Sequence, residues 1–251
     1  MSGMNILESL FRWIHVVFGI LWIGHLYFFN WVNATFAPTM DAETKKKVVP
    51  ELMPRALYMF RWGAAFTWVT GVLLLLLVYY HRGIVFDTGS WNILTLVLVA
   101  VVFVAPFVYD ALVSSAMKDL RTAFIGGLVI SAAYLLLMWW AGFSYRGYAI
   151  HLGSMFGTIM AYNVWFRIWP SQQRIITATK EGTAPDPALV ATAGLRSRHN
   201  TYLSVPLVFT MISQHADASW AGNPLALVIV VAVGWAFVYH MYDRAAQVKG
   251  F

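Results

Sequence analysis

The chain has 251 residues, of which 60% are apolar, 16% aromatic and only 11% charged; soluble domains carry about 25% charged residues, so a soluble globular protein is excluded. It contains no cysteine, which excludes disulfides, cysteine-bound zinc, iron–sulfur clusters and the covalent haem of a C-x-x-C-H motif. The net charge of +6 does not indicate nucleic-acid binding, because most basic residues lie between apolar stretches, as on the cytoplasmic side of a membrane protein.

Seven stretches are long and apolar enough to cross a bilayer, which takes about 20 residues for ~30 Å of hydrocarbon. The expected spans are 8–33, 54–80, 91–113, 122–142, 148–169, 200–216 and 223–243. The sixth is the shortest and contains Pro206, which a neighbouring helix or water can accommodate. The predicted fold class is therefore an all-α integral membrane protein, with residues 1–251 forming a single domain of about seven transmembrane helices.

The distribution of lysine and arginine predicts the orientation. Of the 17 such residues, all except Arg12, Arg82 and Arg146 fall on one side of the membrane in this scheme, and an excess of this kind marks the cytoplasmic face. The amino terminus is therefore expected outside and the carboxy terminus in the cytoplasm. The connections at residues 34–53 and 171–195 are expected to be cytoplasmic loops, with room for a surface helix in each.

The seven histidines fall into two layers, one near each face of the membrane. The outer layer consists of His15, His81, His151 and His215, and the inner layer of His25, His199 and His240. Ionisable side chains at bilayer depth are costly, so they usually mark a pathway, a proton relay or a cofactor. His15 and His25 are separated by about 15 Å along one helix axis, and hydrogen bonding alone poorly explains two histidines on one span.

These layers suggest one or two non-covalent b-type haems, because two histidines at one depth on facing helices can ligate the iron from both sides. The expected outer pair is His15 with His151 or His215, and the expected inner pair is His25 with His240. Other possible axial ligands are Met155, Met160 and Met211. The alternative is that histidines at the span ends only cap helices and meet lipid headgroups.

Polar side chains near the inner face indicate a binding site for an anion. Arg61, Arg167 and Asn163 lie in the inner parts of their spans, and a guanidinium binds planar anions through a fork of N–H donors. We therefore expect these three residues to bind an anionic substrate or a haem propionate. The alternative is a structural ion pair of Arg61 with Asp110, with Arg167 extending to the lipid headgroups.

Several short runs of residues along the chain form a recognisable combination. They are Arg12-Trp13-Ile14-His15 through Gly24-His25 to Tyr27-Phe28, Pro54-Arg55-Ala56-Leu57 to Arg61-Trp62, His151 to Asn163-Val164-Trp165, Ile168-Trp169-Pro170-Ser171-Gln172, and Arg198-His199-Asn200-Thr201-Tyr202. Together these runs resemble the membrane-bound urate hydroxylases of bacteria (the PuuD type). The resemblance covers most of the chain, and its specificity lies in the combination, since any single run is weak.

This resemblance implies a protein of the bacterial inner membrane that oxidises urate to 5-hydroxyisourate and passes the electrons through haem to cytochrome c. Members of that family continue into a periplasmic c-type cytochrome domain, whereas this sequence has no C-x-x-C-H. The expected partners are therefore the lipid bilayer and a separate cytochrome c or other redox subunit, with a homo-oligomer as a further expectation and no nucleic acid. Arg61 and a base, His199 or His240, are the expected catalytic groups.

Other interpretations stay open from the sequence. One is a di-haem b-type or quinol-linked electron-transfer subunit without substrate oxidation of its own, and a related one is a protoporphyrinogen oxidase of the HemJ type. A second class is a transporter or proton channel lined by histidine, for which broken helices or inverted repeats are expected; only Pro106 and Gly126-Gly127 hint at these. A third is an assembly or anchoring subunit.

Overall fold

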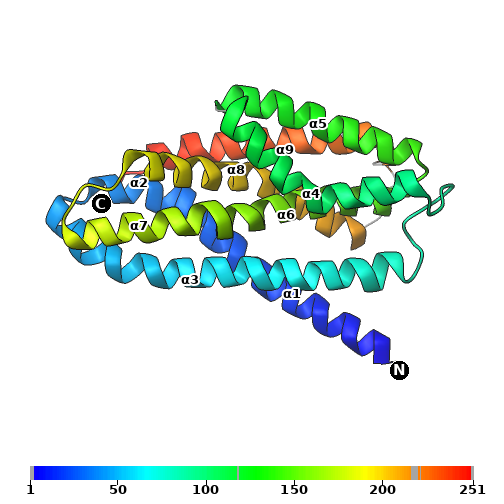
Figure 1. Ribbon diagram of the computed structural model, residues 1–251, viewed down its shortest axis with the longest axis horizontal. Coiled ribbons are helices and arrows are strands. Elements are labelled where there is room, and N and C mark those ends of the chain that lie inside the picture. The colour runs from blue at the N-terminus through cyan, green and yellow to red at the C-terminus, as the bar shows by residue number, and fades with distance from the viewer. Residues whose placement is uncertain (1–2, 118, 216–219, 221, 250–251) are drawn as a thin grey trace. The chain divides into compact units, whose positions relative to one another are not determined.

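A computed structural model describes residues 3–117, 119–215, 220 and 222–249, and Figure 1 shows that its ordered elements are helices. The first half contains α1 (Gly3–Tyr27), η1 (Phe28–Asn33), α2 (Ala34–Phe36), η2 (Ala37–Thr39), α3 (Ala42–Leu74), η3 (Leu75–Tyr80) and α4 (Ile93–Ser115). The second half contains α5 (Leu120–Trp140), α6 (Tyr145–Asn163), η4 (Val164–Ile168), α7 (Trp169–Glu181), α8 (Pro187–Ile212), η5 (Ser213–His215) and α9 (Pro224–Gln247). The described residues form no strand beyond one isolated bridge, so the all-α prediction is confirmed.

Five helical segments are long and apolar enough to cross a membrane, which fits a multi-pass membrane protein. They are Gly3–Thr39, Ala42–Tyr80, Ile93–Ser115, Leu120–Trp140 and Pro224–Gln247, at the places expected for the first four spans and the last. Helices also occupy the places expected for the fifth and sixth spans, in α6 and α8. Both carry buried polar side chains such as His151 and Asn200, and these lower the hydropathy by which a span is recognised.

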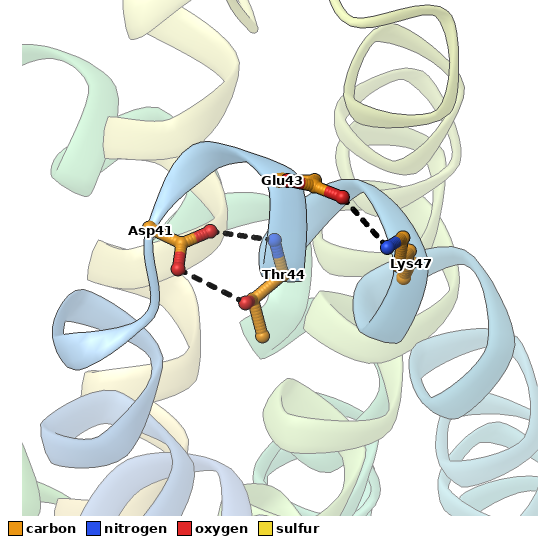
Figure 2. Close-up of polar contacts among 4 residues, drawn as sticks. All are labelled: Asp41, Glu43, Thr44 and Lys47. Carbon is orange, nitrogen blue, oxygen red and sulfur yellow. Dashed lines mark hydrogen bonds and ion pairs between the residues drawn. The ribbon is translucent and has the colours of Figure 1, made fainter.

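The segment expected as the first cytoplasmic loop is largely helical. α3 begins at Ala42, well before residue 54, and continues through Pro50 and Pro54. The carboxylate of Asp41 accepts hydrogen bonds from the backbone N–H of Thr44 at 2.7 Å and from its hydroxyl at 3.1 Å, as Figure 2 shows. An acceptor at this position satisfies N–H groups that have no partner inside the helix.

The second expected loop is also mostly helical. α7 extends to Glu181 and ends at Gly182, whose φ of 76° is a left-handed conformation that glycine adopts without a steric penalty. α8 then begins at Pro187, after a short connection. Proline suits the first turn of a helix because the N–H that it lacks would have no partner there.

The chain divides into two compact units. Unit 1 comprises Met1–Gly71, Met160–Tyr202 and Phe237–Phe251, and unit 2 comprises Val72–Ile159 and Leu203–Ala236.

In unit 1, α1 and α3 pack antiparallel with a close backbone approach. Phe18 stacks on Phe66 with ring centroids 4.6 Å apart, and Phe29 meets Phe60 edge-on at 5.3 Å. Between these contacts, a Cβ added at Gly63 would lie 3.0 Å from the backbone nitrogen of Trp22. Glycine is therefore required at position 63 for the two helices to approach this closely, as is common where membrane helices pack through small residues.

In unit 2, a turn before α4 joins the turn that connects α5 to α6. The backbone N–H groups of Asp87 and Gly89 donate to the carbonyl of Gly142 at 3.1 Å each, and that of Ser144 donates to the carbonyl of Val85 at 2.8 Å. Gly142 has a φ of 82°, which favours glycine. These bonds fix the start of α6, the helix that carries His151.

Candidate functional site

Arg61 lies in unit 1 within a cluster of aromatic side chains, which we call the Arg61 cluster: Tyr58, Arg61, Trp165 and Trp169. The guanidinium carbon lies 3.9 Å from the ring centroid of Trp169, 5.7 Å from that of Tyr58 and 5.9 Å from that of Trp165. Attraction between a cation and an aromatic face acts within about 6 Å. The aromatic rings therefore hold the guanidinium in place.

The two tryptophans reach Arg61 because of their spacing. They are four residues apart, on the π-helical segment η4 and at the first residue of α7, so they project from nearly the same side of the helical backbone. The indole N–H of Trp165 donates to the backbone carbonyl of Arg61 at 3.1 Å. Single-turn π-helical segments inside α-helices often occur at functional sites.

The guanidinium of Arg61 makes neither a hydrogen bond nor an ion pair with any residue that the structure describes, and its Nε is buried. A buried donor without an acceptor costs about 1–3 kcal/mol, and more when it is charged. Such a group is stabilised when an anion supplies the missing acceptors. The Arg61 cluster therefore has the charge and the free donors of an anion-binding site.

Asn163 belongs to a buried amide pair. Its Nδ2 donates to Oδ1 of Asn200 at 2.9 Å, and Nδ2 of Asn200 donates to the backbone carbonyl of Met160 at 3.0 Å. Both asparagine side chains are fully buried. The pair joins α6 to α8 inside unit 1, and it places Asn163 beside the helix that carries His199. Arg167 is half-buried on η4.

The first half of α8 carries an unusual run of buried polar residues within unit 1. Arg196, His199, Asn200 and Thr201 are all buried. Buried polar groups are costly unless they are hydrogen-bonded. His199 therefore lies among buried polar residues, and its expected role as a base stays a prediction.

A second polar network in unit 1 was not predicted from the sequence. Asn30, on the π-helical segment η1, donates to the hydroxyl of Ser197 at 2.8 Å and to the carbonyl of Leu26 at 2.9 Å. It accepts a hydrogen bond from the hydroxyl of Tyr242 at 2.8 Å. The guanidinium of Arg198 lies 4.8 Å from the ring centroid of Tyr242. The signal that could have revealed this network is an asparagine within an apolar first span.

His240 is exposed on α9, whereas Tyr242, two residues later, bonds Asn30. Successive helical residues are rotated by about 100°, so positions two apart point in nearly opposite directions. The structure therefore does not place His240 in this network. Its expected roles as a base and as the inner haem ligand opposite His25 stay predictions.

His15 and His25 present the ring geometry of metal-binding histidines. Nδ1 of His15 lies 2.9 Å from the backbone carbonyl of Thr67, and Nδ1 of His25 lies 2.7 Å from the carbonyl of Leu21. A carbonyl only accepts, so each Nδ1 carries the proton and each Nε2 keeps its lone pair. Histidines that bind a metal usually donate their other ring N–H in this way.

His151, in unit 2, uses both ring nitrogens. Nδ1 donates to the backbone carbonyl of Gly147 at 2.6 Å, and Nε2 accepts from the hydroxyl of Tyr80 at 2.9 Å. The side chain is fully buried and meets Phe143 edge-on, with ring centroids 5.6 Å apart. To ligate iron through Nε2, His151 would first have to release the Tyr80 hydroxyl.

The other expected haem ligands stay predictions. His81 and His215 are exposed, as expected for histidines at span ends. His15 belongs to unit 1, whereas its expected partners His151 and His215 belong to unit 2, so the outer pairing stays a prediction. In the ranges that the structure describes, no three His, Asp or Glu side chains gather as a metal-binding group.

Comparison with known proteins identifies one family. The family model described as urate oxidase N-terminal matches residues 40–250, a range that contains the Arg61 cluster and the buried run of α8. Neither the curated proteins nor the solved structures include a match to this chain.

Proposed function

The chain belongs to the urate oxidase N-terminal family, and from this premise we propose that it oxidises urate to 5-hydroxyisourate at the Arg61 cluster. The reaction adds the oxygen of one water to the purine and releases two electrons and two protons. The family supports a function related to urate, and the five apolar helices support a membrane location. The substrate and the electron acceptor are the proposed part.

The observation that carries the proposal is the unsatisfied guanidinium of Arg61. Urate is an anion near neutral pH, and its carbonyl oxygens and ring nitrogens lie in one plane. The fork of guanidinium donors matches such a planar acceptor edge. We therefore assign Arg61 the role of binding and orienting urate, with Arg167 and Asn163 as further substrate contacts. The aromatic rings partly bury Arg61, and an ion pair in a partly buried site is stronger than one in bulk water.

The released protons need an acceptor close to the substrate. His199 is the stronger candidate of the two expected bases, because it is buried in the polar run of α8, one residue from the Asn163–Asn200 pair. An imidazole nitrogen can accept a proton from a substrate and pass it to a neighbour. His240 is the second candidate, and its exposure suits the later release of a proton rather than the first step.

The proposed cofactor is haem b, in one or two copies. The residues present fit such a group, because His15 and His25 each keep an Nε2 lone pair while Nδ1 is held by a backbone carbonyl. We assign these two as the primary ligands, with His151, His215 and His240 as the expected opposite ligands. When bound, haem supplies one-electron transfer from the substrate site to a cytochrome c. The chain's own contribution is to hold each imidazole in the ligating tautomer.

The proposed topology has seven spans, which are the five apolar segments together with α6 and α8. The amino terminus lies in the periplasm and the carboxy terminus in the cytoplasm of a bacterial inner membrane, following the lysine and arginine bias. Urate would then reach Arg61 from the cytoplasm, while the electrons leave toward a periplasmic cytochrome c or another redox subunit. Fusing a reporter enzyme to each terminus in turn tests this orientation.

The function is tested by anaerobic turnover of the purified chain. We expect urate to reduce added cytochrome c, with 5-hydroxyisourate formed in step, and Arg61→Gln to abolish both. The matched control is Arg55→Gln, because Arg55 is exposed on the same helix and pairs with Glu51 at 2.7 Å. Reduced-minus-oxidised spectra and a pyridine haemochrome assay count the haems. Haem without urate turnover would favour an electron-transfer subunit, and protein without haem would favour a transporter or a structural role.

A further inference from the structure

We propose that Thr70 is a positioning residue that holds the ring of His15 as an axial ligand of the haem. This inference rests on the proposed function, because it concerns the proposed cofactor. It adds a residue that orients the ligand from a second helix. Both residues belong to unit 1, with His15 on α1 and Thr70 on α3.

Three positions on one side of α3 contact the His15 ring. Thr67, Thr70 and Gly71 are spaced i, i+3 and i+4, so they lie on the same side of the helix. Nδ1 of His15 lies 2.9 Å from the carbonyl oxygen of Thr67 and 3.2 Å from the hydroxyl oxygen of Thr70. A Cβ added at Gly71 would lie 3.0 Å from Cε1 of the ring. The ring edge that carries Nδ1 and Cε1 is therefore packed against α3.

The hydroxyl oxygen of Thr70 can accept a hydrogen bond from His15. Its one proton points to the carbonyl of Phe66 at 2.6 Å, which is closer than the carbonyl of Thr67 at 3.2 Å, and a hydroxyl oxygen keeps two lone pairs as acceptors. The Nδ1–H of His15 is therefore shared between two acceptors. An imidazole can pivot about a hydrogen bond to a single acceptor, whereas two acceptors fix the direction of its N–H. Thr70 thus sets the orientation of the ring.

The second ring nitrogen of His15 is accessible to a ligand. Nε2 makes no hydrogen bond with any residue that the structure describes. It is also not one of the buried side-chain atoms that lack a partner, so protein atoms do not enclose it. Histidines that bind a metal usually donate their other ring N–H to a fixed acceptor, which orients the ring and raises the basicity of the ligand. His15 meets both conditions.

His25, the other proposed primary ligand, has no hydrogen-bond partner on a second helix among the described residues. Its Nδ1 lies 2.7 Å from the carbonyl of Leu21, four residues earlier in the same helix. A carbonyl at this spacing is within reach of polar side chains in any helix, so this bond does not depend on how helices pack. The hydroxyl of Thr70 is therefore a feature particular to the His15 site.

The test is the reduction potential of the haem in the purified full chain, measured by dye-mediated titration. Loss of an acceptor for the Nδ1 proton makes the imidazole a weaker donor to the oxidised iron, so the potential should rise. Thr70→Val keeps the shape and removes the hydroxyl. We expect it to shift the reduction equilibrium roughly two- to tenfold, and tenfold corresponds to about 59 mV for one electron. Thr70→Ser keeps the hydroxyl and should restore the wild-type potential.

The matched control is Thr67→Val on the same helix. The hydroxyl of Thr67 donates to the carbonyl of Gly63 at 2.7 Å, and His15 bonds only the backbone of Thr67. We therefore expect Thr67→Val to keep the wild-type potential. Equal shifts in Thr67→Val and Thr70→Val would overturn the inference, and so would a shift in Thr70→Val that Thr70→Ser shares. Size-exclusion profiles that match the wild type show that each variant has folded.

The outcomes separate this inference from the proposed activity. A shift confined to Thr70→Val, in a protein that contains haem but does not oxidise urate, would support the positioning role and reject the activity. Urate oxidation with one and the same potential in wild type and Thr70→Val would reject the positioning role alone. Wild-type protein without haem would overturn both the inference and the proposed cofactor.

Discussion

The indole N–H of Trp165 donates a 3.1 Å hydrogen bond to the backbone carbonyl of Arg61. This bond joins the π-helical segment η4 to α3 within unit 1. It reaches the backbone of Arg61, whose guanidinium has no hydrogen-bond or ion-pair partner among the described residues. Trp165 therefore acts on the anion site through the backbone of Arg61, as a positioning residue. Its ring, 5.9 Å from the guanidinium, adds only a weaker contact.

Trp165→Phe removes this donor and keeps an aromatic ring. A hydrogen bond of this kind contributes about 0.5–1.5 kcal/mol, so we expect the KM for urate to rise roughly two- to tenfold while kcat changes less, because no reacting atom is touched. Steady-state kinetics with cytochrome c as acceptor measure both values, and Trp13→Phe serves as the control, because Trp13 is 68% exposed on α1. A two- to tenfold fall in kcat with an unchanged KM would contradict a positioning role.

Hydropathy predicted the places of the seven longest helices that the structure describes, but not the early starts of α3 and α8. It reports how well a helix surface suits lipid, so it missed the polar start of α3. That start contains Lys45, Lys46 and Lys47, which suit water and still form a helix behind the Asp41 cap. α6 is less apolar than α4 or α5, because buried polar side chains such as His151 and Asn163 lie among its apolar residues.

The sequence predicts those residues of the candidate site that are unusual by themselves in an apolar helix, but not those whose importance comes from a contact with another helix. Arg61 and Asn163 stood out because polar groups are costly at membrane depth. Asn200 was passed over, although it lies beside His199, because its importance comes from a bond to another helix. Tyr242 and Asn30 lie at opposite ends of the sequence, and no periodicity within one span reveals such a pair.

Gly71→Ala tests the place of His15. A Cβ at position 71 would lie 3.0 Å from Cε1 of the His15 ring, so the imidazole must shift away from Thr67. We expect a displaced Soret band or a lower haem content in Gly71→Ala, measured by absorbance and pyridine haemochrome. Gly19→Ala is the control on the facing helix, because its Cβ would meet Thr67 at an ordinary 3.8 Å. Identical spectra in wild type, Gly71→Ala and His15→Ala would exclude His15 as a ligand.

Gly63→Ala tests the contact between α1 and α3. The added Cβ would lie 3.0 Å from the backbone nitrogen of Trp22, and backbone cannot rotate away as a side chain can. Overpacking of this kind costs about 1–3 kcal/mol, so we expect a lower midpoint of thermal unfolding in detergent. Gly24→Ala meets nothing within 4 Å, and its better helix propensity should raise the midpoint slightly, by up to about 1 kcal/mol. Equal shifts in both variants would argue against a close approach at Gly63.

The cap at Asp41 makes the start of α3 sensitive to acid. Hydrogen bonds from the backbone N–H and then the hydroxyl of Thr44 hold the pKa of Asp41 below its ordinary value of 3.8. A carboxylate with a lowered pKa in the folded state contributes stability above its ordinary pKa, and this contribution is lost as the pH falls through the folded value. The first turn of α3 should therefore loosen only in strong acid.

Asp41→Asn separates the charge from the cap, because asparagine caps helices about as well as aspartate and does not titrate. We expect hydrogen–deuterium exchange of the first turn of α3 to match in wild type and Asp41→Asn at pH 7. Near pH 3, exchange relative to an unstructured peptide should rise in the wild type only. Glu43 pairs with Lys47 at 2.7 Å in the same turn, and Glu43→Gln is measured in parallel. Acid loosening that persists in Asp41→Asn and disappears in Glu43→Gln would assign the effect to Glu43 instead.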